Sequence, residues 1–427
     1  MTSFYIETYG ESSFSSDSEQ MAGLLQQAKF EHKEKMEDAD IVILNTRKVK
    51  RTALEPFLTM LDDIKKKYPY KIIIVAGCIP QAESERFKNC TLVGTRQFHH
   101  IVEAVEETLH HNIVTMLEMN EMPPLDLPKI RKNPFLEIIP ITREGQRTAA
   151  ASKTKLIKKN TDSYSKADIV KAAVKAVSEG VKEIWLTSPD VAGYGLNIGT
   201  NLPQVLKELL QIPGNFKIRL DRCNPTHLKK IKADLFPLFA HEKMFKFIHL
   251  PLYSGSNTIL QQMGAGYTKE EVTLSVQELW QIEPHLTLMT DIKVGYPTET
   301  EDDFWETLNL VRFLNPDVMT ISPFVPKPKT LAATLPSLPE EEVQRRVTVL
   351  REIYQNISAL RNERWKGWEG NIVIDESGKQ PQEWIGRNKY YKPVIIEGDF
   401  KIGDEARIRI IKTGRWELRG GESKLAA

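Results

Sequence analysis

Short apolar runs alternate with helical patterns along the first third of the chain. The apolar runs SFYIET, DIVILNT and KIIIVAG predict strands, and helical patterns lie near Ser18–Lys29, Arg51–Lys67 and Ile101–His110. Such alternation indicates a parallel sheet with helices on both faces. A proline-marked connector at Met122–Pro134 interrupts the pattern. We therefore predict a doubly wound α/β domain over residues 1–120.

The same alternation resumes after the connector and then changes once more. Six further strands are predicted, followed by a long closing helix at Leu338–Trp365; the strands are EIIPIT, EIWLTS, FKIRLD, FKFIHLPL, LMTDIKVG and DVMTISPF. This rhythm predicts a partial (βα)6 barrel over residues 134–366, with any active site at the carboxyl ends of the strands. NIVID, PVIIEGD and EARIRIIK then alternate apolar and polar residues, which predicts a small β-barrel over residues 367–427.

Composition narrows the class of protein only slightly. The 427 residues are 41% hydrophobic and 27% charged, which is ordinary for a globular protein, and the net charge of +1 gives no general attraction to nucleic acid. The first residues lack the pattern of a secretory signal, and no apolar run approaches the roughly 18 residues of a membrane span. We therefore expect a cytoplasmic protein with no membrane partner.

Only three cysteines occur, Cys78, Cys90 and Cys223, and they form no CxxC motif. Long separations of this kind argue against a disulfide framework and against a zinc or iron–sulfur site made from local sequence. The ordinary interpretation is that all three are small buried side chains.

Six segments together resemble one family; they are IETYG, DSEQMAGLL, ADIVILNT, VAGCIPQA, GVKEIWLTS and WIGRNKYYKPV. The chain resembles the tRNA methylthiotransferases of the radical S-adenosylmethionine class, in particular the archaeal and eukaryotic type that acts on threonylcarbamoyladenosine. The resemblance runs from about Phe4 to about Ile411. It implies three cysteines of the first domain for one 4Fe-4S cluster and a CxxxCxxC loop of the barrel for a second, which cleaves S-adenosylmethionine. It also implies a C-terminal TRAM barrel that grips tRNA.

The chain departs from this family where the clusters would be held. The ligand positions that the resemblance implies are occupied by non-cysteine residues at five places, Glu11, Arg47, Gly145, Ala149 and Ser152, and only Cys78 is retained. Soft thiolates hold such clusters, and neither glycine nor alanine offers a donor atom. We therefore expect no cluster, no other metal and no catalytic residue, while binding of S-adenosylmethionine is left open.

Other positions of the implied pocket also differ from the family. Pro189 and Tyr253 stand where glutamines are expected, Ala265 replaces an arginine, and a family RPGT reads KPKT with Lys327 and Lys329. Three pocket residues are retained, Asp291, Gly295 and Pro297. We expect them to act structurally, with the glycine at a turn, the proline fixing it and the aspartate capping the loop.

Two basic segments are candidates for RNA contact. Aromatic side chains alternate with cations near the start of the predicted TRAM barrel, and Arg387, Lys389, Tyr390, Tyr391 and Lys392 are the predicted RNA-binding residues. The alternative is a solvated β-edge with incidental aromatics. The second segment is Arg143, Arg147, Lys153, Lys155, Lys158 and Lys159, which is either a solvated loop or a contact for RNA phosphates.

Two polar clusters receive ordinary structural interpretations. His99 and His100, like His110 and His111, are neighbours whose side chains should point apart on a helix, with no cysteine or aspartate to complete a metal set. The acidic run from Glu299 to Asp303 suits a helix N-terminus better than acid–base catalysis.

The leading hypothesis is a methylthiotransferase-like tRNA-binding protein that has lost iron–sulfur-dependent radical chemistry. One alternative is an active threonylcarbamoyladenosine tRNA methylthiotransferase or other tRNA-modifying transferase that works by a route not visible in the sequence. Another is a partner subunit that docks on an intact methylthiotransferase. Iron and sulfide content separates the first two hypotheses.

Overall fold

The computed structural model describes residues 1–10, 12–46, 51–78, 84–87, 89–144, 161–326 and 330–422. These residues form two compact units, Met1–Glu179 and Gly180–Ala427. The domain limits predicted at residues 120, 134 and 366 stay predictions.

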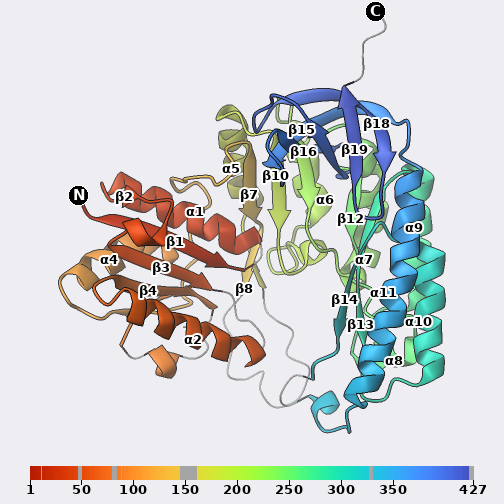
Figure 1. The fold of residues 1–427 in the computed structure, drawn as a ribbon, viewed down its shortest axis with the longest axis horizontal. Helices are drawn as coiled ribbons and strands as arrows, with labels where there is room; N and C mark the ends of the chain where they lie inside the picture. The colour runs from red at the N-terminus through yellow and green to blue at the C-terminus, as the bar shows by residue number, and fades with distance from the viewer. Residues whose placement is uncertain are drawn as a thin grey trace, which may run out of the picture. The chain divides into compact units, whose positions relative to one another are not determined.

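The first unit contains a six-stranded parallel sheet in the order β2-β1-β3-β4-β5-β6 (Figure 1). Its strands are β1 (Ser3–Tyr9), β2 (Glu31–His32), β3 (Ile41–Thr46), β4 (Ile72–Gly77), β5 (Thr91–Gly94) and β6 (Thr115–Met116). Alternate residues of β3 point to opposite faces, so Ile43 and Val42 enter separate apolar clusters. The doubly wound fold is confirmed.

Helices cover both faces of this sheet. The helices are α1 (Ser12–Gln27) and α4 (Ile101–Leu109), which contribute to the core around Ile43, and α2 (Arg51–Lys67), which contributes to the core around Val42. Helix α1 begins at Ser12 rather than near Ser18, because Ser16 and Asp17 are buried through polar contacts instead of apolar periodicity. The short strands β2, β5 and β6 were not predicted, since two to four residues give little pattern.

The rest of the first unit follows the connector. It contains β7 (Leu136–Pro140), the antiparallel pair β8 (Thr142–Glu144) and β9 (Thr161–Ser163), and helix α5 (Lys166–Ser178). Strand β7 packs against α1, where Ser16 Oγ donates a hydrogen bond to the Ile138 carbonyl at 2.9 Å. Three single turns of 3-10 helix complete the described part of this unit, η1 (Met36–Asp38), η2 (Ser84–Phe87) and η3 (Phe98–His100).

The second unit begins with the parallel strands of the barrel. They are β10 (Glu183–Thr187), β11 (Lys217–Leu220), β12 (Phe247–His249), β13 (Thr287–Val294) and β14 (Val318–Pro323). The accompanying helices are α6 (Leu202–Leu209), α7 (Pro225–Leu235), α8 (Asn257–Gln262), α9 (Lys269–Ile282), α10 (Glu301–Leu314) and α11 (Glu340–Glu363), with the turns η5 (Val191–Gly193), η6 (Phe236–Ala240) and η7 (Leu331–Ala333). The predicted strand in EIIPIT is β7 of the first unit, the other five predicted strands are β10 to β14, and the closing helix is confirmed.

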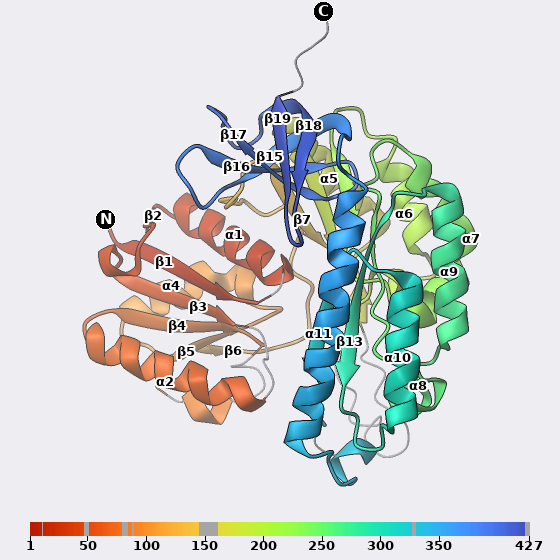
Figure 2. The same cartoon turned by 45° about the vertical axis from the view of Figure 1, so that its right-hand side comes forward.

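The chain then forms a small closed barrel in the order β15-β16-β17-β19-β18. Its strands are β15 (Glu369–Ser377), β16 (Glu383–Asn388), β17 (Pro393–Glu397), β18 (Glu405–Thr413) and β19 (Leu418–Glu422). Alternate apolar side chains such as Ile372 and Ile408 fill its interior, as the sequence pattern predicts. In Figure 1 this barrel, drawn in dark blue, lies at one end of the strands β10 and β12, and Figure 2 shows it at the end of helix α11. Within the described parts of the chain, no helix has the length and apolarity needed to cross a bilayer.

Candidate functional site

The positions implied for cluster ligands fall largely outside the described residues. Glu11, Arg47, Gly145, Ala149 and Ser152 lie there, as do Lys327 and Lys329 and the basic residues Arg147, Lys153, Lys155, Lys158 and Lys159. Cys78 is described and directly follows β4, with a partly exposed side chain.

The other two thiols occupy positions unsuited to cluster ligation. Cys90 is buried in the apolar core beneath α2, where Lys65 Nζ lies 3.2 Å from its sulfur. Cys223 is fully buried, and this burial holds the pKa of its thiol well above the ordinary value. Cluster ligands must be thiolates, and each cluster needs several of them together. The donor set of this chain therefore does not fit the family's clusters.

Charged side chains gather at the carboxyl ends of the barrel strands. Asp291 of β13 lies beside His249 of β12, with 3.1 Å between Oδ2 and Nε2, and Arg222 follows β11 with Nη2 at 3.6 Å from the same oxygen. Burial alone would raise the pKa of Asp291, but the hydrogen bond from His249 and the charges of His249 and Arg222 lower it below the ordinary value. The expectation that Asp291 caps a loop is wrong, because the residue lies within a strand and faces this cluster.

A second charged pair joins the end of strand β10 to helix α7. Asp190 follows β10, and its Oδ2 lies 2.5 Å from Nδ1 of His227 on α7. The other carboxylate oxygen accepts hydrogen bonds from the backbone N–H groups of Ala192 at 3.1 Å and Asn224 at 2.9 Å. Asp190 therefore fixes the ring of a half-exposed histidine in one orientation.

Tyr253 occupies the space between these two groups. Burial raises the pKa of its phenol, and the charges of Arg222, Asp291 and Asp190 act on it as well. Its backbone has a φ of +65°, a conformation that bulky residues rarely adopt. Lys293 Nζ lies 6.0 Å from the centre of the tyrosine ring. A glutamine side chain at this position would leave more open space among the charges.

The retained glycine behaves as the sequence predicts. Gly295 has a φ of +82°, and an added Cβ would lie 2.7 Å from a methyl group of Val343. Its N–H donates to the Glu299 carboxylate at 2.9 Å, which Arg346 also contacts at 2.9 Å. Glu299 is thus a buried structural acid that precedes the helix, whereas Glu301, Asp302 and Asp303 lie in the first turn of α10, as the ordinary interpretation of the acidic run predicts.

The predicted RNA-binding loop packs inside the second unit. Tyr390 is 6% exposed and lies against Trp365, with 4.9 Å between the ring centres. Lys392 is 5% exposed, and its Nζ lies 3.1 Å from the carboxylate of Asp317, just before β14. Arg361 in the last turn of α11 and Arg364 directly after it also contact Asp317. These contacts place the loop at the amino ends of the barrel strands, opposite the Asp291 cluster.

Tyr391 and Arg387 also have partners within the unit. Tyr391 lies among aromatic side chains, 5.0 Å from Phe245 between ring centres, and the guanidinium groups of Arg219 and Arg387 lie 4.9 and 4.7 Å from its ring centre. Arg387 contacts Asp375 at 2.5 Å. Among the five predicted residues, Lys389 alone has an exposed side chain. RNA binding by this loop stays a prediction, and most of its side chains already hold the barrel in place.

The outer face of β18 presents cations that sequence reasoning missed. Arg407, Arg409 and Lys412 are exposed, and Trp416 in the following turn is 57% exposed. Among the described residues, no acidic side chain forms an ion pair with Arg407 or Lys412. The signal for Arg407 and Arg409 was present in EARIRIIK, where these two residues alternate with core residues and therefore face outward. Lys412 is exposed because the register of β18 shifts between Ile410 and Lys412.

The described member of the second basic segment is structural. Arg143 Nη1 and Nη2 donate to the Asp17 carboxylate at 3.0 and 2.6 Å, and Arg143 Nε donates to the Tyr164 hydroxyl at 2.7 Å. Its side chain is 7% exposed. The reading of Arg143 as part of a solvated loop or an RNA-phosphate contact is therefore wrong, because a buried aspartate already neutralises its charge.

Comparisons with known proteins agree with this architecture. Residues 3–93 match the model described as "Uncharacterized protein family UPF0004", and residues 366–421 match the TRAM domain. A radical S-adenosylmethionine methyltransferase structure from Kitasatospora setae aligns with a TM-score of 0.52 at 11% identity, covering 76% of this chain and 75% of that one. The fold is therefore that of a radical-S-adenosylmethionine-like α/β protein with a TRAM barrel.

Similarity to curated relatives narrows the class to one family. The chain is 32% identical to the threonylcarbamoyladenosine tRNA methylthiotransferase of Homo sapiens, over 97% of this chain and 73% of the relative. It is also 32% identical to the probable threonylcarbamoyladenosine tRNA methylthiotransferase of Pyrococcus horikoshii, over 96% of this chain and 97% of the relative. The chain belongs to the threonylcarbamoyladenosine tRNA methylthiotransferase family.

Proposed function

We propose that this protein is a cytoplasmic tRNA-binding member of its family that no longer carries out iron–sulfur-dependent radical chemistry. The observation that carries the proposal is the donor set. Five of the six positions implied for cluster ligands are not cysteines, and the thiols of Cys90 and Cys223 are buried elsewhere. Reductive cleavage of S-adenosylmethionine needs an electron from a cluster, so loss of the ligands removes the reaction.

The carboxyl-end residues support the same proposal. Tyr253 stands among Arg222, Asp291 and Asp190, where the family resemblance implies a smaller glutamine. The surrounding acids and bases are paired with one another, so their charges are largely balanced within the protein. These residues stabilise the barrel end and restrict the space in which a cofactor could be oriented.

Iron and sulfide analysis after anaerobic purification and reconstitution tests the proposal. We expect no charge-transfer absorption in the visible range and no stoichiometric iron. Bound iron with matching acid-labile sulfide would overturn the proposal, because it would require ligands other than those the family uses.

A triple variant provides the matched control. Gly145→Cys, Ala149→Cys and Ser152→Cys together restore a CxxxCxxC spacing, and we expect this variant to capture a cluster under the same conditions. Turnover of S-adenosylmethionine to 5′-deoxyadenosine should still fail, because Pro189, Tyr253 and Ala265 differ from the family. A misplacement of about 1 Å can cost on the order of a hundredfold in rate. Rapid turnover would indicate a pocket that is still competent.

For tRNA binding, we assign the phosphate contacts to exposed cations of the TRAM barrel. Lys389, Arg407 and Lys412 are exposed, whereas Tyr390 and Lys392 are buried by contacts within the unit. The expected measurement is affinity for unmodified tRNA as a function of salt. The affinity should fall as salt rises, because each neutralised phosphate releases counterions.

A further inference from the structure

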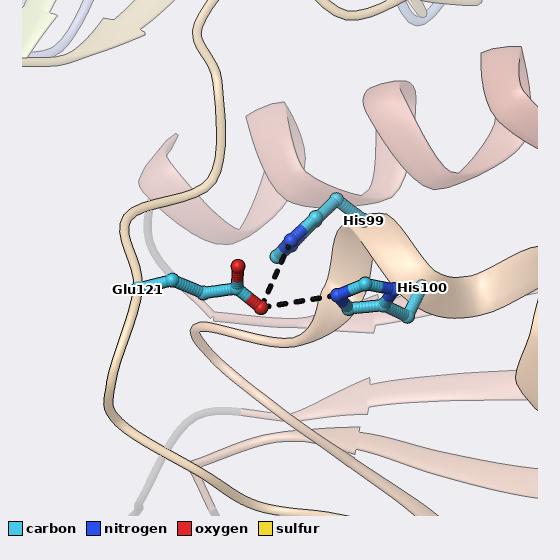
Figure 3. Close-up of side chains that lie close together, drawn as sticks. All are labelled: His99, His100 and Glu121. Carbon is cyan, nitrogen blue, oxygen red and sulfur yellow. Dashed lines mark hydrogen bonds and ion pairs between the residues drawn. The ribbon is translucent and has the colours of Figure 1, made fainter.

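His99, His100 and Glu121 converge in the first unit (Figure 3). His99 and His100 end η3, which follows β5, and Glu121 belongs to the segment after β6. The expectation that the two histidines point apart is wrong, because they lie on a 3-10 turn and not within a regular helix. Their ring centres are 4.1 Å apart, and a glutamate distant in sequence supplies the third group that the sequence did not reveal.

The separations between the ligand atoms suit a small cation. Nε2 of His99 lies 3.3 Å from Glu121 Oε1, and Nε2 of His100 lies 3.0 Å from the same oxygen. Metal–ligand bonds of about 2.0–2.1 Å in tetrahedral geometry place neighbouring ligand atoms about 3.3 Å apart. An ion can therefore replace the hydrogen bonds with small side-chain movements.

The surroundings favour ligation in two ways. The second nitrogen of His100, Nδ1, lies 3.6 Å from the Glu103 carboxylate, so a small movement would form the hydrogen bond that orients metal-binding imidazoles. His99 Nδ1 is buried without a hydrogen-bond partner among the described residues.

Two guanidinium groups lie near the cluster, and both have partners. Arg143, whose charge reaches His99, is held by Asp17, and Arg96 is paired with Asp162. Glu121 is 45% exposed, and its Oε1 lies 3.0 Å from Nε2 of His100. The carboxylate is therefore accessible to an ion from solvent.

We propose that His99, His100 and Glu121 form a binding site for a borderline divalent metal ion of the Zn²⁺ type. Two imidazoles and one carboxylate match the preference of zinc, and three protein ligands leave one position for water. The ion would tie the segment around Glu121 to η3. This site is independent of the iron–sulfur positions and of the proposed tRNA function.

Titration of metal-free full-length protein with Zn²⁺ against a chromophoric chelator tests the site. We expect one equivalent to bind and at least a tenfold loss of affinity in His100→Asn and in Glu121→Gln. Glu103→Gln should weaken binding about tenfold or more through its effect on His100. The double variant His110→Asn with His111→Asn is the matched control, since it removes an exposed histidine pair elsewhere on the same unit, and its affinity should not change.

Co²⁺ spectra separate this site from adventitious binding at cysteine. The proposed ligands give visible d–d bands without the intense near-ultraviolet band of a thiolate ligand. Absence of Zn²⁺ binding, undiminished affinity in Glu121→Gln, or a thiolate band would overturn the proposal. Circular dichroism of each variant confirms that it is folded before its affinity is compared.

Discussion

Two basic segments of the same small barrel differ in solvent exposure: one is largely buried and the other is exposed. Tyr390, Tyr391 and Lys392 face inward on the second unit, where Asp317 and aromatic side chains receive them. Arg407 and Lys412 of β18 face solvent. Both segments combine cations with large apolar side chains, so composition does not distinguish an internal anchor from a solvent-exposed surface. The difference teaches that an aromatic–cation motif indicates RNA binding only where its faces are free.

The largest expected effect is loss of the anchor. Asp317 is fully buried among Lys392, Arg361 and Arg364, so Asp317→Ala leaves three cations without their acid. We expect the free energy of unfolding of the second unit to fall by about 3–5 kcal/mol, measured by urea denaturation. Asp399→Ala, at an exposed position of the same barrel, should change it by less than about 0.5 kcal/mol. Equal effects of the two changes would contradict the anchoring role.

The second expectation separates packing from base stacking at Tyr391. Tyr391→Ala should reduce the free energy of unfolding by about 3 kcal/mol, because it removes a ring packed among aromatic side chains. The affinity of the folded protein for tRNA should stay within twofold at low temperature. A stacked base would instead cost about 1–3 kcal/mol of binding, with little change in stability. Tyr70→Ala, at a position that is 98% exposed, serves as the control.

The third expectation concerns pH. Burial, followed by the charge of Asp375, raises the pKa of Glu183 to about 7 at the interface with the small barrel. The folded state therefore keeps a proton that the unfolded chain releases near pH 4.5. The contribution of protonated Glu183 to the free energy of unfolding is complete below about pH 4.5. It is lost as the pH rises towards 7, which lowers the free energy of unfolding by about 2–3 kcal/mol.

Glu183→Gln should flatten this pH dependence. The charges that face Glu183 are Asp375, Arg387 and Arg219, and the indole N–H of Trp185 donates to its carboxylate at 3.2 Å. Denaturation midpoints at pH 5 and pH 7.5 provide the measurement. Glu352→Gln on the exposed side of α11 is the control and should preserve the slope. If Glu183→Gln changes its denaturation midpoint between pH 5 and pH 7.5 as much as the wild type does, other groups cause the pH dependence.

The smallest expected effect is on the exposed strand. Arg407→Gln with Lys412→Gln should weaken tRNA binding about tenfold, or about 1.4 kcal/mol, without changing stability. The slope of log affinity against log salt should decrease by about 0.7–0.9 for each phosphate contact removed. Lys379→Gln with Lys401→Gln removes two exposed cations from the same barrel and should leave both quantities near their original values. Identical losses in both pairs would indicate a general charge effect.

The sequence by itself determined the order and type of the main elements. The unbroken apolar run DIVILNT predicts a strand buried on both faces, and the alternating EARIRIIK predicts a strand with one buried face. The sequence also showed which residues stand at the five positions where the family resemblance implies cysteines, because residue identity is a property of single positions. Short strands such as β6 escaped prediction, since two residues carry no periodicity.

Only the tertiary structure decided which polar residues meet. Arg143 and Asp17 are distant in the sequence and form a buried pair, and Glu121 completes a cluster with His99 and His100. From the sequence, Lys392 is expected to be a solvated cation, whereas in the fold it is buried beside Asp317. Burial and pairing are properties of the packed chain, because a charge is stabilised by the groups that folding brings to it and not by its sequence neighbours.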